Sequence, residues 1–165
     1  MPAVVSDTSV VNYLAAVGQT ELLRVQFGEI FIPPAVWYEL QAAPALPGAA
    51  AALAAQQAGW LVVQAPKASL LEARLRMDLD DGEAAAIALA CELKPAIVLL
   101  DEADGRAEAE RLGLSIIGTA GILGKARQSG RLRHIRPLLD RLMRDHRFRL
   151  SRELYDQFTM GEPED

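Results

Sequence analysis

Four acidic residues lie where carboxylates could act together on one or two metal ions. Asp7 and Asp101 each directly follow a short apolar run, Glu39 lies one or two turns into an expected helix, and Glu83 opens another. Mg²⁺ and Mn²⁺ prefer oxygen ligands of this kind. Four carboxylates brought together would repel each other unless cations neutralise them. A cation held there could activate water and stabilise charge on a scissile phosphate.

Each acid also has an ordinary structural interpretation. Asp7 is a good helix N-cap, and Glu39 could be an exposed acid on a helix. Residues 80–82 are typical of a turn and cap, and Glu83 could belong to that cap or complement the helix dipole. Asp101 fits such a role less well, because an acid that ends a fully buried strand points into the crevice of the sheet.

The elements that must position these acids alternate between two types. Apolar runs predict five strands, at residues 3–6, 29–32, 60–63, 96–100 and 115–118. Helical spacing and Pro or Gly punctuation predict helices on both sides of Gly18, from Pro34, and at 49–58, 70–77, 83–93, 103–112, 119–129, 134–146 and 151–159. This alternation favours an α/β fold with a mostly parallel sheet and helices on both faces. Residues just beyond the carboxyl ends of such strands line the ligand crevice.

Length and composition indicate one cytoplasmic domain. The chain has 165 residues, 51% of them hydrophobic, and we expect a single domain over residues 1–160 with a disordered tail at 161–165. The lone cysteine, Cys91, cannot form an internal disulfide and is expected to pack inward on a helix. No signal-peptide pattern and no run of about 18 apolar residues is present, so we expect no membrane segment and a reducing, cytoplasmic location.

Charge is distributed unevenly along the chain. The net charge is −5, yet residues 125–149 hold nine of the 17 Lys and Arg and only two acids. This segment could follow a phosphate backbone, or it could form well-solvated helix faces. The two histidines, His134 and His146, both fall in the same region, which argues against a histidine acid–base pair. The sequence shows no phosphate-cradling glycine loop and no Cys/His nucleophile pair.

Four stretches resemble the motifs of PIN domains, in the right order across residues 3–125. VVSDTSVVNYL resembles the opening strand and helix, and IPPAVWYEL resembles the motif of the second acid. LDDGEAAAIALA resembles the third motif, and AIVLLDEADGRAEAERLGLSIIGTAGIL resembles the fourth. The segment RPLLDRLMRDHRFRLSRELYDQF is similar to the end of a bacterial PIN-like subgroup.

This resemblance implies a three-layer α/β/α sandwich and Mg²⁺- or Mn²⁺-dependent endoribonuclease activity on RNA. It assigns catalysis and metal binding to the four acids, with the Ser9 and Thr8 side chains as supporting groups. Many bacterial members are VapC-like toxins of type II toxin–antitoxin pairs. For this chain the resemblance therefore also implies a small antitoxin protein as partner and a homodimer.

Two of the matched motifs depart from the commonest pattern. The third acid is often Asp, whereas here it is Glu83, and Asp80 and Asp81 lie close enough to join the site. Asp104 follows the fourth acid by about one helical turn and could join or replace it as a ligand. Arg106 and the basic segment 125–149 are candidates for contacts with substrate phosphates.

Two other functions remain open at this stage. The chain could be a catalytically weak or inactive PIN-fold module that acts through protein or nucleic-acid contacts. A receiver or covalent phosphatase that uses Asp7 or Asp101 is less well supported. A receiver would have paired acids after the first strand, and a haloacid-dehalogenase-type phosphatase would have an Asp where this chain has Ser9.

Overall fold

One parallel sheet forms the centre of the molecule. The computed structural model describes residues 2–67 and 69–164. The strands are joined in the order β3-β2-β1-β4-β5, and every pairing between neighbours is parallel. Their bounds are β1 (Ala3–Ser6), β2 (Ile30–Ile32), β3 (Leu61–Val63), β4 (Ala96–Leu99) and β5 (Ser115–Ile117). The five strands expected from the apolar runs are thus all present.

Helices connect and cover these strands, as the alternating pattern predicts. Those before β4 are α1 (Thr8–Ala16), α2 (Glu21–Phe27), α3 (Pro34–Ala42), α4 (Pro47–Gln57), α5 (Leu70–Leu75) and α6 (Asp81–Glu92). Those after it are α7 (Ala103–Arg111), α8 (Thr119–Gln128), α9 (Arg136–Asp145) and α10 (Arg152–Phe158). Proline in the first turn suits the starts of α3, α4 and α9, because proline has no N–H to leave unpaired there.

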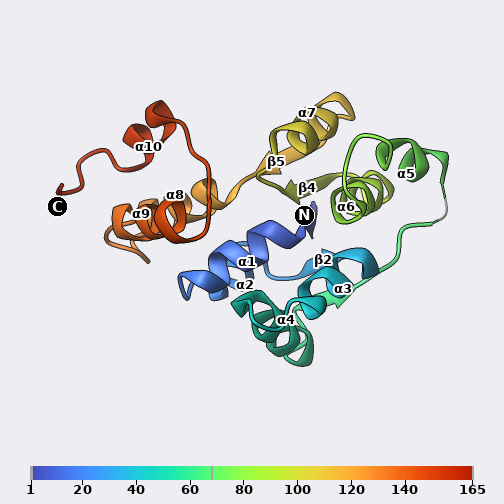
Figure 1. Ribbon diagram of the computed structural model, residues 1–165, viewed down its shortest axis with the longest axis horizontal. Coiled ribbons are helices and arrows are strands. Elements are labelled where there is room, and N and C mark those ends of the chain that lie inside the picture. The colour runs from blue at the N-terminus through green and yellow to red at the C-terminus, as the bar shows by residue number, and fades with distance from the viewer. Residues whose placement is uncertain (1, 68, 165) are drawn as a thin grey trace.

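The sheet separates two apolar cores, which gives three layers. Successive strand residues point to opposite faces, so Val4 packs into one core and Val5 into the other. The first core also takes buried residues of α1 to α4 and of α8 to α10. The second takes those of α5, α6 and α7. Figure 1 shows α5, α6 and α7 together on one side of the strands, with α8, α9 and α10 grouped at the end of the molecule that holds the C-terminus.

The strand order creates a crevice between β1 and β4. From β1 the chain moves outward through β2 to β3, then returns to the other side of β1 to form β4. Ser6 is opposite Leu99 in this register, and the Asp7 N–H donates to the Leu99 carbonyl at 3.0 Å. In parallel sheets the connections leave in opposite directions at such a point, which opens a ligand-binding crevice beyond the strand ends. Asp7 and Asp101 therefore follow the two strands that border the crevice.

Helix α6 is buried on every side rather than on the single face that its periodicity predicts. The sequence places Ala84, Ile87, Ala88 and Cys91 on one apolar face, but all of residues 82–90 are buried. The reason is that α6 contacts β1 and β4 on one side and α3, α5 and α7 on others. Alanine suits this position because its small side chain allows neighbouring elements to approach closely.

The end of the chain is more ordered than the sequence suggests. We predict a disordered tail at 161–165, but Glu162 is 7% exposed and accepts hydrogen bonds from the Ile135 and Arg136 N–H groups at 2.8 and 2.9 Å. The tail thus differs from that prediction at Glu162, because this carboxylate satisfies amides at the start of α9. Asp165 lies outside the described residues. None of the helices in the described ranges is long and apolar enough to span a bilayer.

Candidate active site

Asp7 is the most buried acid of the candidate site. It has the extended backbone of an N-cap for α1, but its side chain makes no capping hydrogen bond. Only 3% of its surface is exposed. The capping interpretation therefore does not explain why an acid is placed here. The carboxylate lies at the end of β1, where the charges of several other acids raise its pKa.

Glu39 is held between two separate parts of the chain. Its Oε2 accepts a hydrogen bond from the Thr8 hydroxyl at 2.5 Å, and its Oε1 accepts one from the Gly82 N–H at 3.1 Å. A Cβ on residue 82 would lie only 2.7 Å from each carboxylate oxygen. Glycine at this position therefore lets the Glu39 carboxylate reach the first turn of α6. An exposed helix acid would need no such arrangement.

Glu83 lies beside Asp80 at the start of the buried helix α6. Asp80 is the N-cap: its Oδ1 accepts from the Glu83 N–H at 2.8 Å, as the turn-and-cap interpretation predicts. The Glu83 side chain itself is directed against α7, where a Cβ on Gly105 would lie 2.7 Å from its Oε2. Only 7% of Glu83 is exposed. It is thus an acid of the interior rather than a solvent-facing residue of the cap.

Asp101 is held in place by the beginning of α8. The Thr119 N–H donates to its Oδ1 at 2.9 Å, and the Thr119 hydroxyl donates to its Oδ2 at 2.7 Å. A Cβ on Gly118 would come within 2.7 Å of Oδ1 and 2.9 Å of Nη1 of Arg106. That Arg106 nitrogen donates to the Leu100 carbonyl at 3.0 Å. Asp101 and Arg106 are therefore neighbours, both fitted closely around a glycine.

The charges of these acids act on one another. The pKa of Asp7 is raised to about 7, mainly by burial; the Thr8 backbone hydrogen bond lowers it, and the carboxylates of Asp80, Glu39 and Asp101 contribute to the rise. Burial also raises the pKa of Glu83 to about 9, with further contributions from Asp80 and Asp7. The pKa of Asp101 is raised by burial, which outweighs the opposing hydrogen bonds from Thr119. The four predicted acids and Asp80 thus form one electrostatic cluster around Asp7.

A family comparison agrees with this architecture. A family model described as a PIN domain matches residues 3–161. The chain belongs to the PIN-domain family. Proteins with PIN domains are generally nucleases, so the fold is of a nuclease type. Among curated proteins, no sequence matches this chain.

The remaining residues named from the sequence fall around this PIN-domain crevice in different ways. Thr8 contacts Glu39, whereas Ser9 lines a separate cavity of about 190 Å³ with Asn12 and Tyr13. Asp81 is exposed, with its Oδ1 3.7 Å from Arg76. Asp104 is exposed in the first turn of α7. Among these residues, Asp80 raises the pKa of both Asp7 and Glu83 through its charge.

Sequence reasoning missed the groups that hold the carboxylates. Gly82, Gly105 and Gly118 each lie against one acid, and Thr119 donates twice to the acid beside Gly118, Asp101. Each contact joins parts of the chain that no short motif connects. The available signal is the glycine beside an acid in two motifs, DDGE and DEADG; of these, residues 80–82 are interpreted from the sequence as a turn and cap.

The chemistry of this cluster suits a hard divalent cation, although its present arrangement is not that of a formed metal site. A cation would relieve the repulsion that raises the pKa of Asp7, and carboxylate oxygens are suitable ligands. Within residues 2–67 and 69–164, no three His, Cys, Asp or Glu side chains are placed to hold a metal ion together. The carboxylate oxygens of Glu39 accept hydrogen bonds from Thr8 and Gly82, and those of Asp101 accept hydrogen bonds from Thr119. A carboxylate oxygen has lone pairs for both a hydrogen bond and a cation, so these donors can orient Glu39 and Asp101 while a metal ion binds.

Proposed function

We propose that this PIN-domain protein is a Mg²⁺- or Mn²⁺-dependent endoribonuclease that hydrolyses RNA phosphodiesters. One observation carries the proposal: acids from three other segments gather around Asp7 at the switch point of the sheet. Burial and mutual repulsion raise the pKa of Asp7 to about 7. A bound cation would therefore stabilise the site by neutralising the ionised Asp7 carboxylate. Perturbed acids in a crevice are typical of functional sites.

In this proposal Asp7, Glu39, Glu83 and Asp101 are the metal-binding and catalytic residues. A bound Mg²⁺ or Mn²⁺ would supply an activated water and neutralise charge at the scissile phosphate. Thr8 and Thr119 orient the second and fourth of these carboxylates through their hydroxyl groups. Asp104, exposed one turn after Asp101, is in the same proposal a further ligand that could join or replace Asp101 at the metal ion.

The groups around the acids have supporting roles. Arg106, placed beside Asp101, is suited to hold a non-bridging oxygen of the substrate phosphate. Ser9 would support the site through the first turn of α1, next to Thr8, because its side chain lines a separate cavity. The basic helices α8 and α9 would attract the rest of the RNA strand through long-range charge.

We further propose that the protein is the toxin of a type II toxin–antitoxin pair. It would then act in the cytoplasm as a homodimer that a small antitoxin protein inhibits. The support is the resemblance of the C-terminal segment to the end of a bacterial PIN-like subgroup, since many bacterial PIN-domain proteins are toxins of such pairs. A neighbouring gene for a small antitoxin-like protein and a dimer in sedimentation analysis would agree with this role; a monomer with no such gene would contradict it.

RNA cleavage tests the proposed activity directly. Wild type and Asp7→Asn are incubated with single-stranded and structured RNAs, in Mn²⁺ and in chelator, beside Asp145→Asn as a control at an exposed acid. We expect Mn²⁺-dependent cleavage by wild type and the control, and a loss of at least about 100-fold in Asp7→Asn. Equal cleavage by wild type and Asp7→Asn would contradict the assignment.

A PIN-fold binding module without activity is the alternative, and the absence of a formed metal site among the described side chains favours it. A Mn²⁺ titration separates the two functions. A ligand that binds the native state raises its melting temperature. A melting temperature that does not change with Mn²⁺, together with no RNA cleavage, would favour the binding module.

A further inference from the structure

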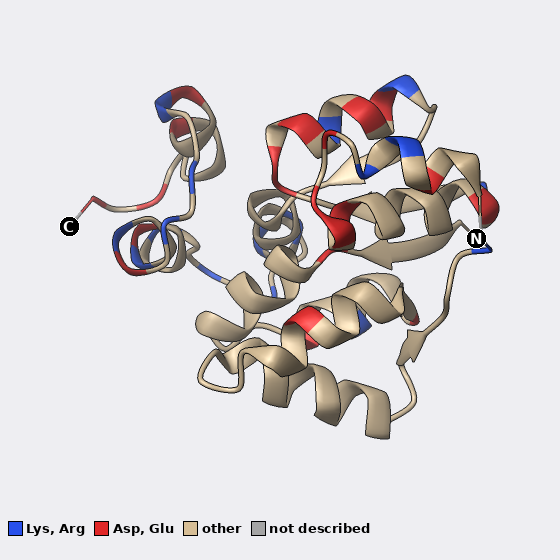
Figure 2. Cartoon of the chain, turned by 45° about the vertical axis from the view of Figure 1, so that its right-hand side comes forward, with Lys and Arg blue, Asp and Glu red and all other residues tan. Residues whose placement is uncertain are grey.

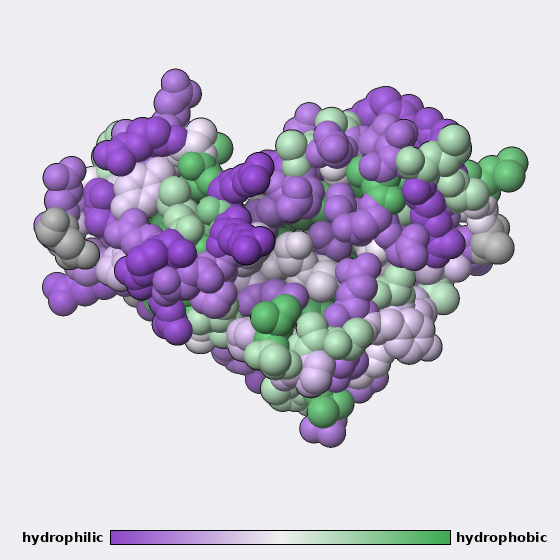
Figure 3. All heavy atoms as spheres, in the orientation of Figure 1, coloured by the Kyte–Doolittle hydropathy of each residue, from purple (hydrophilic) through white to green (hydrophobic). Residues whose placement is uncertain are grey.

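A second cavity shares one wall with the acid cluster. Its volume is about 440 Å³, within the range of roughly 300–1,000 Å³ usual for small-ligand sites. It is enclosed by β5 and the start of α8 on one side and by residues 148–158 on the other. Figure 3 shows the surface hollowed between the C-terminal helices and the side of the molecule that carries α7.

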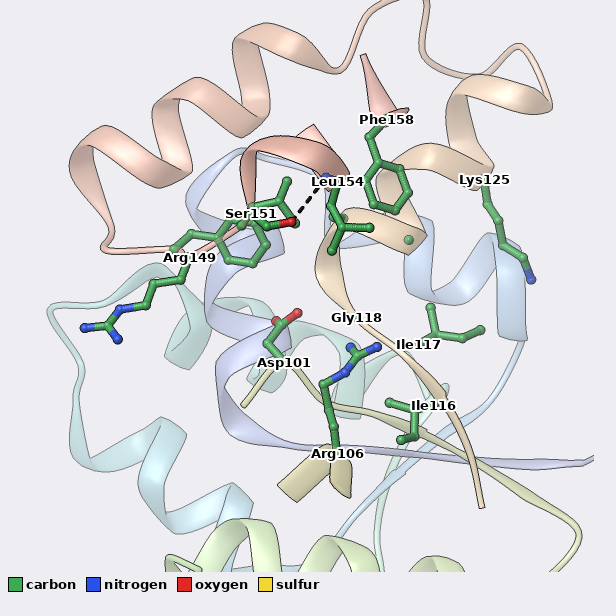
Figure 4. Close-up of a pocket in the computed structure, with 14 residues that line it drawn as sticks. Asp101, Arg106, Ile116, Ile117, Gly118, Lys125, Arg149, Ser151, Leu154 and Phe158 are labelled. Atoms are coloured by element: carbon green, nitrogen blue, oxygen red, sulfur yellow. Dashed lines mark hydrogen bonds between the residues drawn. The ribbon is translucent and has the colours of Figure 1, made fainter. Parts of the chain in front are cut away.

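Asp101 links this cavity to the candidate active site. Its carboxylate lines the cavity and also raises the pKa of Asp7. Figure 4 shows Asp101 and Arg106 side by side at the base of the cavity, below Leu154 and Phe158. A molecule bound in the cavity would therefore lie directly beside the acid cluster.

The charged groups of the cavity are mainly cationic. Arg106 lies at its base, and Figure 4 shows Lys125 and Arg149 on opposite sides of the opening. Asp101 is the one acid among the side chains that line it. Three cations spread across an opening in this way suit a chain of phosphates better than a single compact anion.

The opposite wall is apolar and partly aromatic. Leu150, Leu154 and Phe158 line it, and Leu154 is 44% exposed although it faces the cavity. Phe158 lies against Gly124, where a Cβ would come 2.9 Å from its ring. Ser151 caps α10 through the Leu154 N–H at 3.2 Å, which fixes the helix that carries both side chains. Such a wall offers a flat apolar surface to a nucleobase.

The acids and the basic residues near this cavity come from different parts of the chain (Figure 2). Acidic segments at the start of α6 and in the loop after β4 lie close together, while basic residues occur along the C-terminal helices. A substrate that spans both groups would have phosphates near the cations and its reacting phosphodiester near the acids. This polarity matches a strand that runs through the cavity toward the crevice.

We propose that the cavity is a nucleotide subsite that receives one unpaired nucleotide of the substrate, next to the phosphodiester that is cut. The base packs on Leu154 and Phe158, while Arg106, Lys125 and Arg149 hold the flanking phosphates. The proposal rests on the proposed ribonuclease function and assigns the recognition of an unpaired nucleotide to the walls of this cavity. A base in a duplex is stacked and paired, so it must be extruded before it can enter a pocket.

Binding without cleavage tests this subsite. The probe is a fluorescein-labelled RNA hexanucleotide, compared with the same six nucleotides within a hairpin stem. Affinities are measured by fluorescence anisotropy in chelator, with wild type and with each variant in the otherwise unchanged chain. We expect the single strand to bind at least about tenfold more tightly than the stem.

Three variants address the walls, each with a matched control. Leu154→Ala removes the apolar surface, and Leu53→Ala removes a leucine of similar exposure, 41%, on α4. Lys125→Gln and Arg149→Gln remove the cations at the opening, and Arg133→Gln removes an exposed arginine of the same basic segment. We expect a loss in affinity of about tenfold for each cavity variant and less than about twofold for the controls. The two cation variants should also weaken the dependence of affinity on salt.

The outcomes separate this proposal from the proposed function. If all three cavity variants bind and cleave RNA as wild type does, the subsite is overturned. The proposed ribonuclease function would still hold in that case, because RNA is cut in the presence of Mn²⁺. Equal affinity for the single strand and the stem would overturn it as well. Selective loss of single-strand binding in the cavity variants would support it, including when no RNA is cleaved. A melting temperature within a few degrees of wild type shows that a variant is folded. If Leu154→Ala is not folded, Lys125→Gln provides the test, because Lys125 is exposed.

Discussion

The Gly82 N–H donates a 3.1 Å hydrogen bond to Oε1 of Glu39, and so joins the first turn of α6 to α3. The two residues are 43 positions apart in the sequence. The contact places an acid of the second motif against the backbone of the third, directly beside Glu83. The absence of a side chain at residue 82 is what makes the approach feasible.

Adding one methyl group to Gly82 should displace Glu39. In Gly82→Ala the new Cβ would lie 2.7 Å from both carboxylate oxygens, so the acid must move. Alanine favours helices by about 1 kcal/mol over glycine, and this gain offsets the cost of moving Glu39, so the free energy of unfolding should change little. We expect a loss of about 100-fold in the initial rate of Mn²⁺-dependent RNA cleavage.

A double-variant comparison shows whether this loss acts through Glu39. If it does, Gly82→Ala combined with Glu39→Gln should be no slower than Glu39→Gln alone. Cleavage by Gly82→Ala at the wild-type rate would show that the position of Glu39 has no effect on the reaction.

The Thr119 hydroxyl should be needed for full activity because it orients Asp101. Thr119→Val removes the 2.7 Å hydrogen bond but keeps the backbone N–H, and Thr119→Ser keeps both donors. We expect about a tenfold loss in rate for valine and near wild-type activity for serine.

The same change should alter the pH profile. Hydrogen bonds from Thr119 lower the pKa of Asp101, so their loss raises it and moves the acidic limb of the rate profile to higher pH. Identical profiles for the valine and serine variants would argue against this role.

The metal-free protein should lose stability as pH rises, because of Asp7. Its pKa is 3.8 when unfolded and about 7 when folded, so the folded state binds more protons between these values. Stability from this group is therefore fully present below about pH 4 and is lost as pH rises through 7. The difference corresponds to about 4 kcal/mol at most.

Melting curves of Asp7→Asn in chelator measure this effect. The variant should melt well above wild type at pH 8 and close to it at pH 4, and Mn²⁺ should stabilise wild type at pH 8. Asp145→Asn is the matched control, since Arg144 lowers the pKa of that exposed acid and gives the opposite sign. Parallel curves for wild type and Asp7→Asn would disprove the assignment of a raised pKa.

Loss of the Glu162 carboxylate should destabilise the C-terminal part of the fold. Glu162→Ala leaves the Ile135 and Arg136 N–H groups without their acceptor and removes the carboxylate that lies 3.4 Å from Arg127. We expect a decrease of about 3 kcal/mol in the free energy of unfolding, measured in urea. Glu164→Ala, at an exposed acid two residues away, should change it by less than about 0.5 kcal/mol.

Local patterns in the sequence were sufficient to predict most of the elements of this fold. The apolar run 3–6 and the proline that starts α3 are local signals, and both elements lie where these signals indicate. Asp7 and Asp101 could be named as crevice residues because a position just after a parallel strand is itself a local property. The family then follows from four such motifs in order, and it is confirmed by the match over residues 3–161.

Contacts between distant segments were decided only by the tertiary structure. The order β3-β2-β1-β4-β5 brings Asp7 beside Asp101, and packing then sets Gly82 against Glu39 and Thr119 against Asp101. Helix periodicity could not predict the complete burial of α6, which depends on the elements around it. Hydrophobic spacing and turn residues act over a few positions, whereas these contacts depend on how whole elements pack. The chain's own pattern therefore determines which acids are available, and the fold determines which groups hold them.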